Sequence, residues 1–176
     1  MAPATLRTLH VRATPGTRTR GVLLAGPLAI PVALGRGGIL ANKREGDGAT
    51  PRGRFRLVRL WWRADRAPRP ATLLPARRIG PRDAWCEDPA DRHYNRHIEI
   101  PPGAPGDRLR REDHLYDFMI EITHNARPRV AGRGSAVFIH VARPGLAPTA
   151  GCVAMTAARL RYLLRRMGPQ TRIVVH

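Results

Sequence analysis

Cys152 and His140 are the two side chains whose types and spacing could most directly support covalent chemistry. The histidine lies near the end of the apolar run Ser135–Val141, and the cysteine follows after a loop rich in glycine and proline. Only a thiolate attacks an electrophile efficiently, so a thiol near neutral pH needs an adjacent imidazole to take its proton. A strand, a returning loop and a second strand could bring the two groups together. A buried structural cysteine beside a hydrogen-bonded histidine explains this pair equally well when it is taken alone.

The surrounding residues resemble the signature of the L,D-transpeptidase (YkuD-like) family, in which a histidine in an apolar strand precedes a Ser/Thr-x-Gly-Cys loop end. An upstream segment also resembles the family's Thr-Pro-x-Gly-x-Phe motif. The resemblance extends from about Gly35 to the C-terminus. The matching residues are Ile139-His140, Thr149-Ala150-Gly151-Cys152-Val153 and, upstream, Thr50, Pro51, Gly53 and Phe55.

This resemblance implies a mechanism with named residues. Cys152 would be the nucleophile and His140 the base that takes its proton. The backbone carbonyl of Val141 would orient the imidazole, and backbone N–H groups around Gly151 and Cys152 would form an oxyanion hole. The chain departs from many relatives at Ala150 and Ala154, where a second histidine and an arginine or asparagine are common. These departures affect the substrate contacts and leave the nucleophile and base in place.

The resemblance also implies a substrate class and a location. Peptidoglycan stem peptides would be the partners: a diaminopimelate carbonyl is the usual donor, and an amine of a second stem accepts it in a 3-3 or 1-3 crosslink. No cofactor is implied, carbapenems are expected to acylate the cysteine, and a monomer is expected. Periplasmic or cell-wall activity is implied, although residues 1–16 show no apolar segment typical of a secretory signal peptide.

The hydrophobic pattern predicts a mostly β chain with one helix near the C-terminus, an α+β class. In the family this corresponds to a single-domain L,D-transpeptidase-like β-sandwich spanning residues 1–176. A helix is expected after Thr156, with Leu160, Leu163, Leu164 and Met167 on one face and Gly168-Pro169 at its end. The predicted strands are Leu6–Val11, Gly21–Leu24, Leu28–Leu34, Phe55–Trp62, His114–Ile122, Ser135–Val141 and Thr171–Val175, the first three consecutive and antiparallel.

A proline-rich segment, residues 63–111, interrupts this regular pattern. Its prolines exclude long helices, and its aromatic residues favour an ordered lid or substrate wall over a disordered linker. The Thr-Pro-x-Gly motif just before the strand Phe55–Trp62 is more typical of a residue set that shapes the sheet than of a substrate contact. The expected contacts to a stem peptide are Tyr94, Asn95, Arg96, His114, Tyr116 and Thr149.

The composition sets further bounds. The 176 residues suffice for one domain with a proper core, and no run is long and apolar enough to span a bilayer. The two cysteines, Cys86 and Cys152, could form a disulfide, but a nucleophilic Cys152 must be free, so two thiols are predicted. No Cys/His cluster has zinc-like spacing, so no metal site is expected. The formal net charge is +18, and Lys43 is the one lysine.

Two rival functions remain open at this point. A cysteine hydrolase on the same scaffold, an L,D-carboxypeptidase or endopeptidase, would use the same two residues. An arginine-rich nucleic-acid-binding protein with an inert Cys152 would account for the charge, because arginines attract polyanions. No nucleic-acid-binding signature accompanies the charge, and the aromatic residues are too scattered for a base-stacking platform, so no nucleic-acid partner is expected.

Overall fold

Short apolar segments separated by tight turns form the strands of this protein. The computed structural model describes residues 5–104 and 106–176. Residues 1–4, which belong to the stretch that shows no apolar signal-peptide segment, and Pro105 of the proline-rich segment lie outside the described residues. The strands are β1 (Thr8–Ala13), β2 (Arg20–Ala25), β3 (Leu28–Ala33), β4 (Ile39–Leu40), β5 (Thr50–Pro51), β6 (Gly53–Trp62), β7 (Ala76–Arg78), β8 (Asp83–Trp85), β9 (His97–Glu99), β10 (Asp107–Arg108), β11 (Phe118–Ile122), β12 (Phe138–Val141), β13 (Val153–Met155) and β14 (Arg172–Val175).

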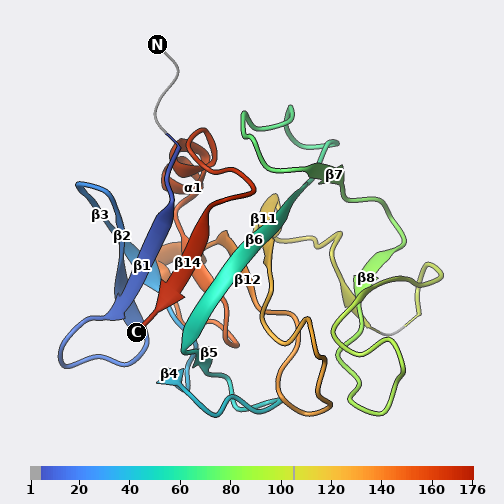
Figure 1. The fold of residues 1–176 in the computed structure, drawn as a ribbon. Helices are drawn as coiled ribbons and strands as arrows, with labels where there is room; N and C mark the ends of the chain where they lie inside the picture. Colours follow the sequence, from blue (N-terminus) through green and yellow to red (C-terminus); the bar gives the residue numbers. More distant parts are fainter. Residues whose placement is uncertain (1–4, 105) are drawn as a thin grey trace.

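The main sheet closes on itself (Figure 1). Its strand order is β11-β12-β13-β3-β2-β1-β14-β6-β7, and β6 also pairs with β11, so that β11 has a partner on both edges. Strands β1, β2 and β3 are consecutive and antiparallel, as predicted. The closed sheet encloses one apolar core between its facing walls, in agreement with the predicted mostly β sandwich. The residues at its centre include Leu9, Leu23, Ile30, Leu60, Ile120 and Ile139.

One α-helix, α1 (Ala157–Leu164), completes this core, and a short 3-10 turn covers Pro144–Leu146. Leu160, Leu163 and Leu164 are buried against the sheet interior. Thr156 occupies the N-cap position, but its side chain makes no capping hydrogen bond, in contrast to the sequence expectation. Among the described residues, no helix has the length and apolar character needed to cross a membrane.

The proline-rich segment forms a second layer on the outer face of the sheet. It lies beside β6 and β11, on the right in Figure 1, and contains a three-stranded sheet of order β10-β8-β9. Trp85 and Leu109 of this layer pack against Trp61, Met119 and Phe138 of the main sheet in a second apolar cluster. The outer side of β6, β11 and β12 is therefore covered by protein. The role of this segment as a lid stays a prediction.

The predicted strand His114–Ile122 begins later than expected. Residues 114–117 form a turn in which the N–H of Asp117 donates to the His114 carbonyl at 3.2 Å, and the strand starts at Phe118. The guanidinium of Arg66 stabilises this turn through the Asp113 carbonyl (2.7 Å) and the Asp117 carboxylate (2.6 Å). Tyr116 therefore belongs to the outer cluster, while Phe118 faces the inner core. The alternation in the sequence placed both on one face because it extended the strand through the turn.

Asn95 joins the outer layer to the main sheet. Its side-chain amide donates to the carbonyls of His124 (3.0 Å) and Asn125 (2.9 Å). Its side-chain carbonyl accepts from Trp85 Nε1 (2.9 Å) and from the N–H of Ala136 (3.2 Å). The backbone φ of 54° is one that asparagine tolerates better than most residues. The side chain expected to contact a substrate is thus fully engaged within the protein.

We predict that Asn95→Ala lowers the free energy of unfolding by about 2 kcal/mol or more, because it leaves buried donors and acceptors unpaired. Chemical denaturation followed by tryptophan fluorescence measures this change. Arg96→Ala is the matched control: the neighbouring side chain is exposed, and its removal is expected to change the stability by no more than about 0.5 kcal/mol. Equal losses in the two variants would contradict the assigned role of Asn95.

Candidate active site

Parallel pairing of β12 with β13 brings the cysteine beside the histidine strand. His140 lies opposite Ala154 in this register, and Cys152 directly precedes β13. The N–H of Phe138 donates to Cys152 Sγ at 3.3 Å, and the thiol donates to the carbonyl of Ala136 at 3.3 Å. His140 and Cys152 are both buried, with 5% and 6% of their surfaces exposed. Both line one cavity of about 350 Å³.

A single hydrogen bond fixes the tautomer of His140. Its Nδ1 lies 2.8 Å from the carbonyl oxygen of Val141, which can only accept, so Nδ1 carries the hydrogen. Burial lowers the pKa of this imidazole to about 4, against a smaller opposing effect of the Val141 carbonyl. The ring is therefore neutral at pH 7, and Nε2 is left with a free lone pair. The ring of Tyr116 packs edge-on against it at 5.5 Å between centroids.

The thiol of Cys152 is also neutral at rest. Burial raises its pKa to about 12, and the hydrogen bond from the Phe138 N–H offsets only part of this effect. Both cysteines of the chain are free thiols, as predicted. The resting site therefore holds a protonated thiol and an unprotonated imidazole, and not a thiolate–imidazolium pair.

The loop before Cys152 is held by close backbone contacts. Gly151 has φ of +141°, and a Cβ at this position would lie 2.8 Å from the carbonyl oxygen of Ala49. Its N–H donates to Thr149 Oγ1 at 3.1 Å, and that hydroxyl donates to the Cys152 carbonyl at 2.7 Å. Thr149 thus lines the cavity with a hydroxyl that is engaged within the loop. The N–H of Gly151, expected in an oxyanion hole, is likewise engaged, which leaves the N–H of Cys152 as the candidate donor.

The upstream motif supports this loop from behind. Thr50 Oγ1 accepts the N–H of Gly35 at 2.9 Å, and Gly35 forms an isolated parallel bridge with Thr149. Gly53 has φ of +149°, and a Cβ there would lie 2.9 Å from the ring of Phe55. None of the motif residues Thr50, Pro51, Gly53 and Phe55 is among the described residues that line the cavity. These contacts favour the shaping role predicted for the motif.

The other predicted contacts are divided by the fold. Tyr116 lines the cavity beside His140, whereas Tyr94, Asn95, Arg96 and His114 do not. The hydroxyl of Tyr94 donates to Glu45, and Glu45 lines the cavity. Tyr94 therefore contacts a wall residue and does not itself line the cavity. Arg96 faces a different cavity. The side chain of His114 is 78% exposed and contacts the Asp117 carboxylate at 2.8 Å.

The cavity walls carry charges of both signs that the sequence analysis did not single out. Burial raises the pKa of Asp107 to about 6, and Arg111 lies 3.8 Å from its carboxylate. Within the described residues, no cluster of three or more His, Cys, Asp or Glu side chains could hold a metal ion. The four-residue spacing of Asp107 and Arg111 was a weak signal in the sequence for this ion pair. The other charged residues of the cavity come from loops that lie far apart in the sequence. The charged wall residues are Arg36, Lys43, Arg111 and Arg143 on the basic side and Glu45, Glu87 and Asp107 on the acidic side.

The chain matches a known protein family over most of its length. A family model described as the L,D-transpeptidase catalytic domain (YkuD) matches residues 17–175, a range that contains His140, Cys152 and the Thr50–Phe55 motif. No match was found among curated proteins.

The neutral resting pair predicts the pH dependence of Cys152 alkylation. With a thiol pKa of about 12, the thiolate fraction at pH 8 is roughly a thousandfold below that of an ordinary cysteine, so modification by iodoacetamide is slow and rises steadily with pH. Peptide mass spectrometry at pH 5 to 10 measures the rate at this residue, with urea-unfolded protein as the control for ordinary reactivity. A rate plateau between pH 5 and 7 would instead indicate a preformed ion pair.

Proposed function

The chain belongs to the L,D-transpeptidase catalytic domain (YkuD) family, and from this premise we propose that it is a cysteine-dependent peptidoglycan L,D-transpeptidase. It would take the acyl group of a diaminopimelate-containing stem peptide onto Cys152. It would then transfer that group to an amine of a second stem, in a 3-3 or 1-3 crosslink. Such a substrate implies activity in the periplasm or cell wall. We propose that it acts as a monomer and without a cofactor.

One observation carries the proposal. The Nδ1–H of His140 is bonded to the Val141 carbonyl at 2.8 Å, and the cavity that the ring lines also contains Cys152. This hydrogen bond leaves Nε2 as the ring nitrogen able to accept a proton. A histidine in the opposite tautomer would have no lone pair at Nε2. The backbone carbonyl thus supplies the orienting function that an aspartate or asparagine supplies in other cysteine enzymes.

The first half-reaction follows from these roles. Cys152 Sγ attacks the donor carbonyl carbon while its proton passes to His140 Nε2. Transfer before attack is unfavourable, because burial raises the pKa of the thiol to about 12 and lowers that of the imidazole to about 4. The two events therefore occur together. Collapse of the tetrahedral intermediate breaks the C–N bond, the leaving amine takes the proton from Nε2, and a thioester remains.

The second half-reaction reverses the roles. An acceptor amine attacks the thioester carbonyl and loses a proton to His140 Nε2. The C–S bond breaks, the sulfur recovers a proton from the imidazolium, and the new amide leaves. Water in place of the amine would give hydrolysis, the rival activity. In both halves the oxyanion would be stabilised by the N–H of Cys152, with nearby cations adding favourable charge.

The mixed charges of the cavity support a zwitterionic substrate. Arg36 and Arg143 line it as cations, and Glu87 and Asp107 line it as acidic side chains whose pKa values burial raises to about 7 and about 6. A diaminopimelate side chain carries an ammonium and a carboxylate, so it can be matched by walls of opposite sign. The Tyr116 hydroxyl, which bonds to no other described residue, is a further candidate contact. Ala150 also lines the cavity where many relatives have a second histidine.

We predict that a carbapenem acylates Cys152 and no other residue. Intact-mass spectrometry is expected to show one added carbapenem mass on the wild type and on Cys86→Ser, and none on Cys152→Ser. Cys86→Ser is the matched control because it removes the other buried thiol. His140→Gln is expected to slow acylation by about 10²- to 10⁴-fold, the usual worth of a general base. An unchanged mass in the wild type would count against the nucleophile.

We further predict that the enzyme forms crosslinked dimers from disaccharide-tetrapeptide fragments. Liquid chromatography with mass spectrometry separates dimers from trimmed monomers, and tandem spectra distinguish 3-3 from 1-3 bonds. Transfer is expected to exceed hydrolysis at millimolar acceptor, and both products should vanish in Cys152→Ser. Trimmed monomers alone, at every acceptor concentration, would assign the chain to the hydrolase alternative.

A further inference from the structure

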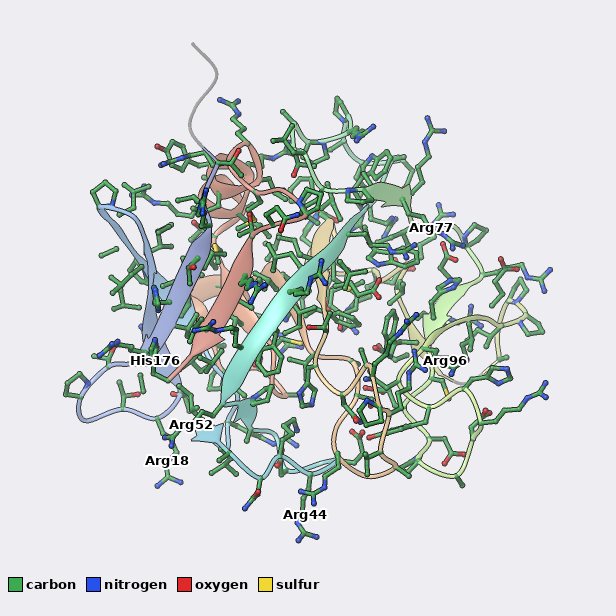
Figure 2. The ribbon with its side chains drawn as sticks, in the orientation of Figure 1. Arg18, Arg44, Arg52, Arg77, Arg96 and His176 are labelled. Carbon is green, nitrogen blue, oxygen red and sulfur yellow. The ribbon has the colours of Figure 1, made fainter. Side chains whose placement is uncertain are left out.

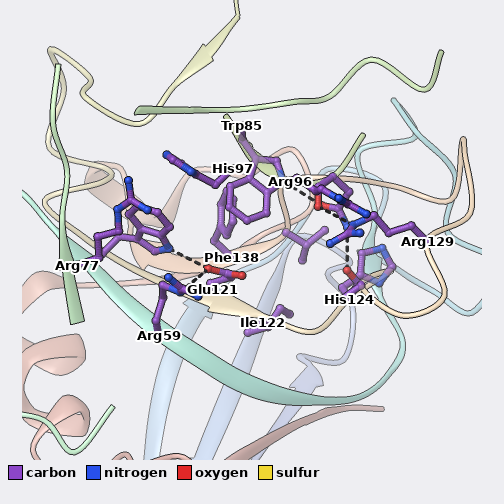
Figure 3. Close-up of a pocket in the computed structure, with 14 residues that line it drawn as sticks. Arg59, Arg77, Trp85, Arg96, His97, Glu121, Ile122, His124, Arg129 and Phe138 are labelled. Atoms are coloured by element: carbon purple, nitrogen blue, oxygen red, sulfur yellow. Dashed lines mark hydrogen bonds and ion pairs between the residues drawn. The ribbon is translucent and has the colours of Figure 1, made fainter. Parts of the chain in front are cut away.

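A second cavity lies on the same outer face as the catalytic one. It has a volume of about 290 Å³ and shares no lining residue with the cavity that contains Cys152. The two are neighbours, because Phe138 lines the second cavity while its N–H contacts Cys152 Sγ in the first. Figure 3 shows Glu121 and Ile122 toward the bottom of the view, Trp85 and His97 toward the top, and Phe138 between them.

Cations predominate in this second cavity. Four arginines line it, against one carboxylate, Glu121. That carboxylate already accepts from Trp61 Nε1 at 3.0 Å and pairs with Arg59 Nε at 3.2 Å. In Figure 3, two arginines lie to one side of Phe138 and two to the other. The arginines are Arg59 and Arg77 at one end and Arg96 and Arg129 at the other. At the first end the second arginine, Arg77, is also paired, because its Nη2 lies 3.3 Å from the Asp83 carboxylate.

Among the described residues, no carboxylate forms an ion pair with Arg96 or Arg129, although Glu121 acts on Arg129 from a greater distance. The guanidinium of Arg96 makes no hydrogen bond or ion pair within the described part of the chain. Arg129 donates from Nε to the Asn95 carbonyl at 3.3 Å, which leaves its two terminal nitrogens available. Burial, followed by repulsion from Arg96 and Arg127, lowers the pKa of Arg129. Like charges held this close to one another attract an anion.

Hydrogen bonds and ring contacts hold the residues that line this cavity in place. Asn95, whose side chain makes four hydrogen bonds, holds the segment that carries Arg96. Trp85 packs edge-on against Phe138 with 5.0 Å between ring centroids, and the guanidinium of Arg77 lies over the ring of Trp61 at 4.9 Å. A ligand therefore meets prearranged donors, and little ordering of the protein opposes binding.

We propose that this second cavity binds a ligand in which an oxyanion group, phosphate or carboxylate, is joined to an uncharged portion. Arg96 and Arg129 hold the oxyanion, whereas Arg59 and Arg77 at the other end are already paired with Glu121 and Asp83. Planar guanidinium groups bind both phosphate and carboxylate oxygens in pairs. The uncharged portion packs on Phe138 and Trp85. This inference does not rest on the transpeptidase activity, because no catalytic residue lines the cavity.

The test uses the full chain, with tripolyphosphate as the phosphate probe and citrate as the carboxylate probe. Two of the three tryptophans, Trp61 and Trp85, line the cavity, so binding is expected to change tryptophan fluorescence. Isothermal titration calorimetry gives the affinity independently. Arg96→Gln/Arg129→Gln is expected to weaken binding by about tenfold or more, because it removes the charge-assisted donors at one end. Arg96→Gln alone, which breaks no contact within the described residues, gives the same direction without affecting the fold.

The matched control is Arg18→Gln/Arg52→Gln. It also removes two positive charges, but from exposed positions that lie well away from Arg96 in Figure 2. Binding within about twofold of the wild type is expected there, since distant surface charges are screened by salt. The tighter of the two probes identifies the source as phosphate- or carboxylate-bearing. Equal weakening in both double variants would assign the effect to overall charge and overturn the proposal, as would the absence of binding of both probes to the wild type.

Discussion

The parallel pairing of β12 with β13 is the constraint on which the candidate site depends. Parallel neighbours cannot be joined by a tight hairpin, so the chain must leave the sheet and return. Here the return is made by residues 142–152, and Gly151 brings the backbone against Ala49 where no other side chain would fit. The loop therefore has one place to end, and that place puts Cys152 on the same cavity as His140. The Thr50 segment stabilises this ending from the other side.

Burial then determines the chemistry of the pair. A thiol and an imidazole removed from water both favour their neutral forms, so neither group is charged before a substrate arrives. A neutral thiol reacts slowly with adventitious electrophiles, and in the proposed mechanism proton transfer is part of the attack itself. The Val141 carbonyl contributes orientation without adding a charge that would raise the imidazole pKa strongly. In this mechanism the cysteine reacts only when a substrate carbonyl is correctly placed beside it.

The outer layer forms part of the walls around the candidate active site. By packing Trp85 and Leu109 on the sheet, the proline-rich segment covers apolar residues of β6, β11 and β12 and at the same time encloses two cavities side by side. One contains Cys152 and has walls of mixed charge, and the other is lined by arginines. Asn95 is the common support, because its side chain ties this layer to the strand that leads to His140. The candidate active site and the second cavity therefore depend on the same tertiary contacts.

The sequence by itself determined the mostly β class and the C-terminal helix, because these follow from local periodicity. The prediction that Cys152 and His140 form the reacting pair came from a resemblance carried by a loop motif within a few residues. Tertiary structure alone decided which face Tyr116 occupies, since a turn stabilised by Arg66, from a distant segment, ends the strand before it. It also decided that Asn95 is a structural side chain and that Arg96 and Arg129 stand together. Charges and hydrogen-bond partners that meet across long sequence separations leave no periodic signal, so only the folded chain reveals them.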